Sequence, residues 1–353
     1  MNRALSHVFS LAVAAVTLCS APVMAQELKQ DHFKVIGITS TIPAAIYDEK
    51  PFWTKTIPEA SKGKLTADLT PIEQMGLDDQ SMLRMMKLGV MDFAGMDITR
   101  MGGDDPRFEG CDLAGVLPDM KRARAACSAY RDVLGARMEA NWNTKLLAIG
   151  ASTPQVIWCR DEIKSLADLK GKKIRVFNNT LRDFITGLGA TSVSIAFSEV
   201  VPALSNGVVD CAVTGSLSGN TAGWPEVTKS VFMLPVGWSF NVVAVNKKRW
   251  DNLPAETREF LTKQFAAYED KMWDTLAQGM EQAALCNTGK DGCKLGKPAH
   301  VTLVTPSDAD MQRAKEIVSN NVLPGWAKRC GTACVADWNA KIGAIAGVKM
   351  NAN

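Results

Sequence analysis

Histidine is scarce in this chain, with three copies among 353 residues, and beyond residue 25 only His32 and His300 remain. Neither has a partner at the spacing of a metal site or a catalytic triad. The chain also lacks a Cys-x-x-Cys pair, a glycine-rich phosphate loop and a nucleophile elbow, because Leu217 stands where the stretch Gly215–Gly219 would need serine. A nucleophile without a positioned base has little reactivity. These absences argue against an enzyme, and we expect no cofactor and no metal.

Excess charge of one sign is missing too. The chain has 40 Lys and Arg against 37 Asp and Glu, which gives a formal net charge of +3. The basic cluster Lys121–Arg124 lacks aromatic partners, which is typical of a solvated helix face. The sequence therefore gives no reason to expect a nucleic-acid partner.

No apolar stretch is long enough to cross a bilayer. The short run Val8–Leu18 follows Arg3 and precedes the small-residue stretch Val23–Ala25, which is the order of an export signal cleaved after Ala25. We therefore expect residues 26–353 to form a soluble, exported protein. A chain of that length normally divides into two domains, each with its own core.

Eight of the nine cysteines follow the predicted signal, an even number in an oxidising compartment, so disulfides are expected. The tight spacings favour Cys286 with Cys293 and Cys330 with Cys334. Cys111 with Cys127, and Cys159 with Cys211, would then pair within each lobe. A four-cysteine zinc site made from the two C-terminal pairs is the alternative, which export and the irregular spacings disfavour.

A helix–Gly–Val–X–Asp–strand pattern occurs twice, at Gly89–Phe93 and at Gly207–Cys211. Strands that alternate with helices imply parallel sheets with helices on both faces, and ligands bind beyond the carboxyl ends of such strands. The strand that follows each glycine ends at Asp97 in the first half and at Thr214 in the second. The pattern predicts two similar α/β lobes that face each other across a cleft.

One arginine lies in the middle of a β-prone run. After a short apolar turn that ends at Gly171, the run Ile174–Phe177 carries Arg175. A guanidinium on a rigid strand can bind a carboxylate through two parallel hydrogen bonds, better than a lysine does. From this residue alone, a solvated strand face remains the alternative.

Several stretches together are similar in order and spacing to a known family, although no single one is diagnostic: Ser61–Leu65, Lys87–Phe93, Leu147–Gly150, Asp168–Val176, Leu188–Ala190, Ala196–Leu204, Gly207–Asp210 and Val245–Pro254. Over nearly its whole length beyond the signal, the chain resembles the solute-binding subunits of TRAP transporters, the periplasmic receptors of tripartite ATP-independent, ion-driven importers. The resemblance implies an α/β fold of the two-lobed periplasmic binding protein type (type II-like), with a ligand cleft between the lobes and a long bridging helix. The sequence is compatible with such a helix, because the segment after Pro254 can run unbroken to Leu285. We expect a signal peptide at 1–25, lobe I in 26–152 with 242–285, and lobe II in 153–241 with 286–353.

The resemblance also implies a binding site. Arg175 occupies the position of the arginine that binds the ligand carboxylate, and the other candidate contacts are Gln155, Phe197, Thr214, Asn241, Asp97 and Asp78 or Asp79, of which we select Asp79. Many sugar-acid binders of the family have a second arginine at the place of Gln155 and an asparagine at that of Thr214. With one guanidinium, we expect a monocarboxylate with hydroxyl, keto or apolar substituents. Phe197 is equally compatible with a core position, and the aspartates with helix caps.

The predicted function is that of a monomeric periplasmic receptor, in a Gram-negative-type bacterium, that captures a small organic carboxylate and delivers it to the membrane subunits of a TRAP permease. One alternative is an exported enzyme on the same fold, which would need a titratable pair in the cleft, whereas the sequence offers only lone aspartates. Another is a sensor module that passes ligand information to a membrane kinase.

Overall fold

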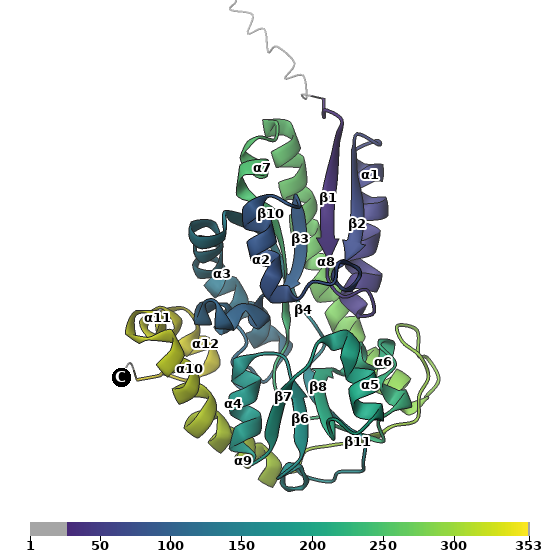
Figure 1. Ribbon diagram of the computed structural model, residues 1–353, viewed down its shortest axis with the longest axis vertical. Helices are drawn as coiled ribbons and strands as arrows, with labels where there is room; N and C mark the ends of the chain where they lie inside the picture. Colours follow the sequence, from purple (N-terminus) through teal and green to yellow (C-terminus); the bar gives the residue numbers. More distant parts are fainter. Residues whose placement is uncertain (1–26, 352–353) are drawn as a thin grey trace, which may run out of the picture.

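The computed structural model describes residues 27–351, which contain a five-stranded sheet in the order β2-β1-β3-β10-β4 and a six-stranded sheet in the order β11-β9-β5-β8-β6-β7 (Figure 1). Each sheet forms the centre of one lobe, so the two-lobed α/β fold is confirmed. Among the described residues, none of the helices combines the length and apolar character that a membrane span requires. The predicted signal peptide lies outside the described residues.

The first sheet consists of β1 (Asp31–Gly37), β2 (Leu65–Pro71), β3 (Phe93–Asp97), β4 (Thr144–Ala151) and β10 (Phe240–Asn246). The second consists of β5 (Gln155–Cys159), β6 (Lys173–Val176), β7 (Thr191–Ser194), β8 (Cys211–Gly215), β9 (Ser230–Phe232) and β11 (Thr302–Val304). The helices are α1 (Ile57–Ala60), α2 (Asp79–Leu88), α3 (Met120–Trp142), α4 (Asn179–Gly187), α5 (Val200–Ser205), α6 (Ser216–Thr221), α7 (Lys247–Asp251), α8 (Ala255–Thr288), α9 (Asp308–Ile317), α10 (Leu323–Cys330), α11 (Thr332–Trp338) and α12 (Ala344–Ala346).

The repeated sequence pattern has the same structure in both lobes. In each, three parallel strands pair in equivalent order, β2-β1-β3 in the first lobe and β7-β6-β8 in the second. The aspartate before the third strand accepts a backbone hydrogen bond from the first strand, Lys34 N to Asp92 at 2.9 Å and Lys173 N to Asp210 at 2.8 Å. The sequence therefore predicted a real structural repeat.

The sheets are not purely parallel, which corrects one expectation. β10 runs antiparallel to β3 and β4, and β5 runs antiparallel to β8 and β9. The reason is the connectivity: the chain passes from β4 directly into β5 and from β9 back into β10, so these strands enter each sheet from the opposite lobe.

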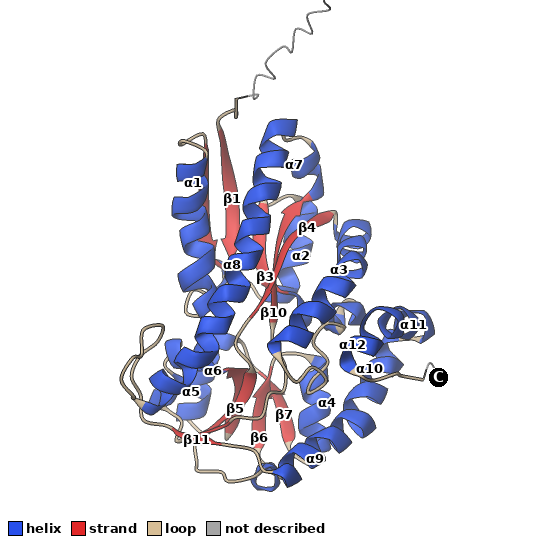
Figure 2. Ribbon diagram, turned by 180° about the vertical axis from the view of Figure 1, so that it is seen from behind, coloured by secondary structure: helices blue, strands red, loops and turns tan. Residues whose placement is uncertain are grey.

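One helix, α8, is long enough to contact both lobes. It has 34 residues, from the cap at Pro254 to Gly289, and at 1.5 Å per residue it is roughly 51 Å long. It packs against β4 of the first sheet and against α6 beside the second sheet. Figure 2 shows α8 running along both lobes. The structure thus contains the long helix that the segment after Pro254 allowed.

The C-terminal helices cover the junction between the lobes. The indole of Trp326 donates to Pro106 O at 2.8 Å and that of Trp338 to Gly110 O at 2.8 Å, at the two ends of the short 3₁₀ helix Pro106–Glu109 that precedes α3. Arg329 pairs with Asp183 of α4 in the second lobe, with its Nη2 2.7 Å from a carboxylate oxygen. The segment predicted to lie with lobe II therefore contacts both lobes.

The described residues contain three disulfides, Cys159–Cys211, Cys286–Cys293 and Cys330–Cys334, all of which were predicted. The zinc alternative is wrong, because its four cysteines are bonded in pairs. The predicted bond between Cys111 and Cys127 is absent: both are buried thiols whose Sγ atoms lie 2.7 Å apart.

We nevertheless expect Cys111 and Cys127 to be joined in protein from an oxidising compartment, since a disulfide has an S–S distance of about 2.05 Å and a small shift would form it. Alkylation under denaturing, non-reducing conditions followed by mass spectrometry should then find no free thiol. The control is Cys111→Ser, which should leave one cysteine to be alkylated. Alkylation of both residues in the unchanged protein would contradict the expectation.

Candidate functional site

A narrow cavity lies between the two lobes and is lined by residues of both. Six of the seven predicted site residues line it: Asp79, Asp97, Gln155, Phe197, Thr214 and Asn241. The fold explains this convergence, because Asp97 ends β3, Thr214 is next to the end of β8, and β5 begins at Gln155. Asn241 of β10 lies opposite Asp97 in the first sheet.

The seventh predicted residue, Arg175, lies directly behind the cavity wall. Its side chain is completely buried, and its guanidinium lies 5.4 Å from the ring centre of Phe177 and 5.8 Å from that of Phe197, two residues that line the cavity. Nε donates to Ile195 O at 3.0 Å and Nη1 to Val213 O at 2.9 Å. Within residues 27–351, Nη2 has no hydrogen-bond partner.

Burial lowers the pKa of Arg175 well below its usual value, and the neighbouring charge of Arg100 acts in the same direction. A buried cation that lacks a counter-ion is costly, and a bound anion removes much of that cost. The position can therefore bind an anionic group, with Nη2 as the free donor.

Sequence reasoning missed Arg100, which also lines the cavity. It follows Asp97 by three residues, in the short 3₁₀ helix Ile98–Gly103. Its Nε lies 3.3 Å from a carboxylate oxygen of Asp79 and 3.3 Å from one of Asp97. The cleft thus holds a second guanidinium, and the two aspartates are not isolated as expected, since they share one arginine.

Asp79 and Asp97 have different surroundings. Asp97 accepts hydrogen bonds from Thr99 N, Thr99 Oγ1, Arg100 Nε and Ser239 Oγ, so it caps a helix and also lines the cavity. Among the described residues, Asp97 N is the one donor to Asp79, at 3.1 Å, and the other oxygen of Asp79 faces Arg100. Burial raises the pKa of Asp79, against the attraction of Arg100. Asp78, the alternative candidate, is exposed and caps α2 by accepting from Ser81 N.

The two crossings between the lobes provide polar groups that the sequence did not reveal. Ser152 accepts from Asn241 Nδ2 at 3.2 Å, and Ser239 contacts Asp97. Ser239 has a left-handed backbone (φ 52°), which Asp112 holds by accepting from Trp238 N and Ser239 N, both at 2.8 Å. Burial raises the pKa of Asp112 to about 7. The return crossing is thus fixed by a carboxylate distant in sequence.

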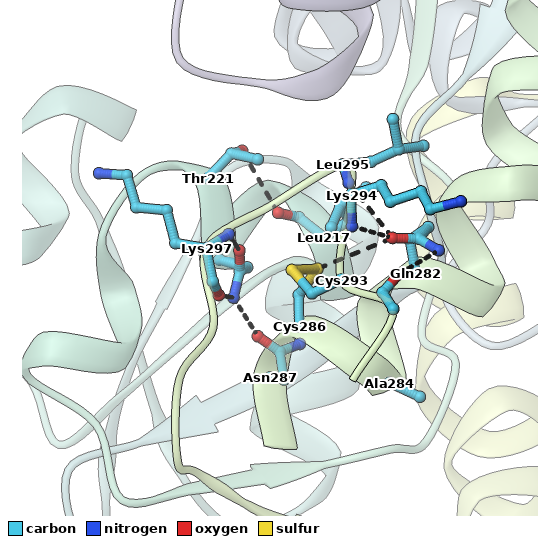
Figure 3. The surroundings of a disulfide bond; sticks show 12 residues. Leu217, Thr221, Gln282, Ala284, Cys286, Asn287, Cys293, Lys294, Leu295 and Lys297 are labelled. Atoms are coloured by element: carbon cyan, nitrogen blue, oxygen red, sulfur yellow. Dashed lines mark hydrogen bonds between the residues drawn. A yellow bond between two sulfur atoms is a disulfide. The ribbon is translucent and has the colours of Figure 1, made fainter. Parts of the chain in front are cut away.

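A disulfide loop holds α6, the helix that contributes Ser218 to the cavity (Figure 3). Asn287, next to the disulfide residue Cys286, donates to Ser216 O at 2.8 Å, at the start of α6. The amide of Asn220 donates to Asn287 at 2.9 Å and accepts from Lys297 N at 2.7 Å. The end of α8 therefore positions one wall of the cavity.

The segment that follows β1 forms another wall, and a buried carboxyl supports it. Ile38 lines the cavity, and its N–H donates to Glu49 Oε2 at 2.9 Å. Burial raises the pKa of Glu49 to about 8, so this group is largely protonated at neutral pH. In the described part of the chain, no cluster of His, Cys, Asp and Glu side chains has the arrangement of a metal site.

Comparison with known proteins identifies the family of this chain. Residues 44–321 match the family model described as bacterial extracellular solute-binding protein, family 7. An uncharacterised protein of Haemophilus influenzae is 25% identical over 284 residues, which is 78% of this chain and 83% of that protein. The C4-dicarboxylate-binding periplasmic protein DctP of Rhodobacter capsulatus is 26% identical over 220 residues, 60% of this chain and 63% of that one.

Solved structures show the same fold at lower identity. The crystal structure of DctP7, a Bordetella pertussis extracytoplasmic solute receptor binding pyroglutamic acid, superposes with a TM-score of 0.78 at 18% identity. The match covers 88% of this chain and 99% of that one. At this identity the likeness establishes the architecture.

Proposed function

Because the chain belongs to family 7 of the bacterial extracellular solute-binding proteins, we propose that it captures a small organic carboxylate in the cleft between its lobes and delivers it to an ion-coupled TRAP permease. The family consists of solute-binding proteins, not enzymes. The receptor acts in the periplasm as a monomer, and the membrane subunits of the permease are its partners.

The observation that carries this proposal is the free donor of Arg175. A fully buried guanidinium has two of its nitrogens fixed by Ile195 O and Val213 O, while Nη2 has no partner in the described part of the chain. A ligand carboxylate that enters beside Phe177 and Phe197 would meet this donor. Charge-assisted hydrogen bonds of this kind are short and about twice as strong as neutral ones.

We infer that the ligand is a monocarboxylate. The relatives do not decide this, since the Rhodobacter protein is described as binding C4-dicarboxylates and the Bordetella receptor as binding pyroglutamic acid, a monocarboxylate. In this chain Gln155 and Thr214 line the cavity with neutral polar groups, and Phe197 adds apolar surface. These groups suit hydroxyl, keto or apolar substituents on the same ligand.

A thermal-shift screen of organic acids tests the proposal. Pyroglutamate, lactate, galactonate, orotate and succinate should be compared, and at least one monocarboxylate should raise the melting temperature. A ligand at 100 times its Kd adds about 2.7 kcal/mol of stability. If no acid in the panel stabilises the protein, or if stabilisation is equal in the Arg175→Lys variant, the proposed function is wrong.

A further inference from the structure

We propose that Asp79 determines the charge of the ligand: it holds Arg100 in an ion pair, so that only Arg175 is free for a carboxylate and the cleft rejects dicarboxylates. This inference rests on the proposed function and adds a specificity-determining residue to it. The residue acts through Arg100, not through contact with the ligand carboxylate.

The two arginines lie on opposite sides of the cleft. Arg100 belongs to the first lobe, and its guanidinium lies 4.8 Å from the ring centre of Phe177 in the second. Arg175 lies 5.4 Å from the same ring centre. A ligand beside Phe177 is therefore close to both cations, and a second carboxylate could bind Arg100 if that residue were free.

Arg100 is not free, because two carboxylates neutralise it. Its Nε lies 3.3 Å from Asp79 and 3.3 Å from Asp97, and the three side chains are four-fifths or more buried. An entering second carboxylate would have to displace these oxygens and would also meet their negative charge. Like charges at such separations in a poorly solvated site are strongly unfavourable.

Both aspartates pair with Arg100, and its Nε donates a hydrogen bond to Asp97, but Asp79 is the one with few other partners. Asp97 has three further donors in Thr99 and Ser239, which hold it in place whatever Arg100 does. In the part of the chain that the structure describes, Asp79 has a single hydrogen bond, in which one oxygen accepts from Asp97 N, and its other oxygen faces Arg100. An asparagine at this position keeps an acceptor for Asp97 N and removes only the charge.

The test compares two ligands of similar shape that differ by one charge, succinate and its half-amide succinamate. Their Kd values are measured by calorimetry for the unchanged protein, for Asp79→Asn and for Asp78→Asn. Asp78 is the matched control, because it is exposed and caps α2, a role that asparagine also fills. Circular dichroism and melting temperature establish that each variant is folded.

We expect the unchanged protein to prefer succinamate and Asp79→Asn to shift the ratio of the two Kd values toward succinate by about tenfold or more. Asp78→Asn should leave the ratio within about twofold. The proposal is overturned if the unchanged protein prefers succinate, if Asp79→Asn gives succinate no advantage (including the case in which it binds neither), or if Asp78→Asn produces the same shift. Any of these results, together with panel acids whose binding still needs Arg175, would leave the proposed function standing.

Discussion

Replacement of Arg175 by lysine should weaken binding of the monocarboxylate found in the panel by one to two orders of magnitude. The guanidinium donates from Nε to Ile195 O and from Nη1 to Val213 O. In the described part of the chain, Nη2 has no partner and is free for the ligand. Lysine has one nitrogen on a flexible stem and cannot reproduce this fixed geometry. A hydrogen bond to a charged group is worth about 1.5–3 kcal/mol, and each 1.4 kcal/mol changes the affinity tenfold. Isothermal titration calorimetry measures the change.

Arg182→Lys is the matched control, because Arg182 is exposed on α4 in the same lobe. The Arg182→Lys variant should bind the monocarboxylate with the same affinity as the unchanged protein. Since Arg175→Lys also leaves one or both carbonyl groups without a donor, its melting temperature should be recorded, and binding compared well below it. A folded Arg175→Lys variant with unchanged affinity would show that Arg175 does not bind the carboxylate.

The second large effect is a gain in stability. Glu49→Gln should raise the free energy of unfolding at pH 8 by on the order of 4 kcal/mol, because each pKa unit corresponds to about 1.36 kcal/mol and burial raises the pKa of Glu49 from 4.5 to about 8. Between these two values the folded protein holds a proton that the unfolded chain has lost. The unchanged protein therefore loses stability as the pH rises from about 4.5 to 8, and Glu49→Gln does not have this loss.

Denaturant unfolding at pH 5 and pH 8 measures the effect. The two proteins should be nearly equal at pH 5 and differ at pH 8. Glu59→Gln, on the exposed surface of α1, removes a similar charge and should follow the unchanged protein. Glutamine keeps an acceptor for Ile38 N, so packing should persist. If Glu49→Gln is no more stable than the unchanged protein at pH 8, the carboxyl is ionised there and its raised pKa is wrong.

Local patterns predicted much of this structure. The glycine and aspartate of each repeat predicted where β3 and β8 begin. The carboxyl-terminal parts of these strands place Asp97 and Thr214 at the cavity. Short cysteine spacings predicted two of the three disulfides for a similar reason, since residues close in sequence are constrained to be close in space. In these cases the interacting residues are close in the sequence, or the side chain belongs to a strand whose position the local pattern predicts.

The rest depends on contacts between distant segments. Arg100 belongs to the site because it lies between Asp79 and Asp97. Asp112 supports the site because it accepts hydrogen bonds from the backbone of Trp238 and Ser239, which are distant from it in the sequence. Neither residue has a local pattern that distinguishes it from a solvated charge. The antiparallel direction of β10 likewise follows from the chain crossing twice, which no propensity encodes.

The two copies of the structural repeat differ in charge at one equivalent position, which makes the two sides of the cleft unlike. Ile36 pairs with Ala94 in the first lobe as Arg175 pairs with Ala212 in the second, so the two residues occupy equivalent positions. One copy of the repeat presents a hydrocarbon side chain where the other presents a cation. A symmetrical pair of arginines would accept an acid in either of two orientations. If the acid group binds Arg175 as proposed, Ile36 gives the first lobe no cation at the equivalent position. The ligand is then expected to bind in one orientation, with its acid group toward the second lobe.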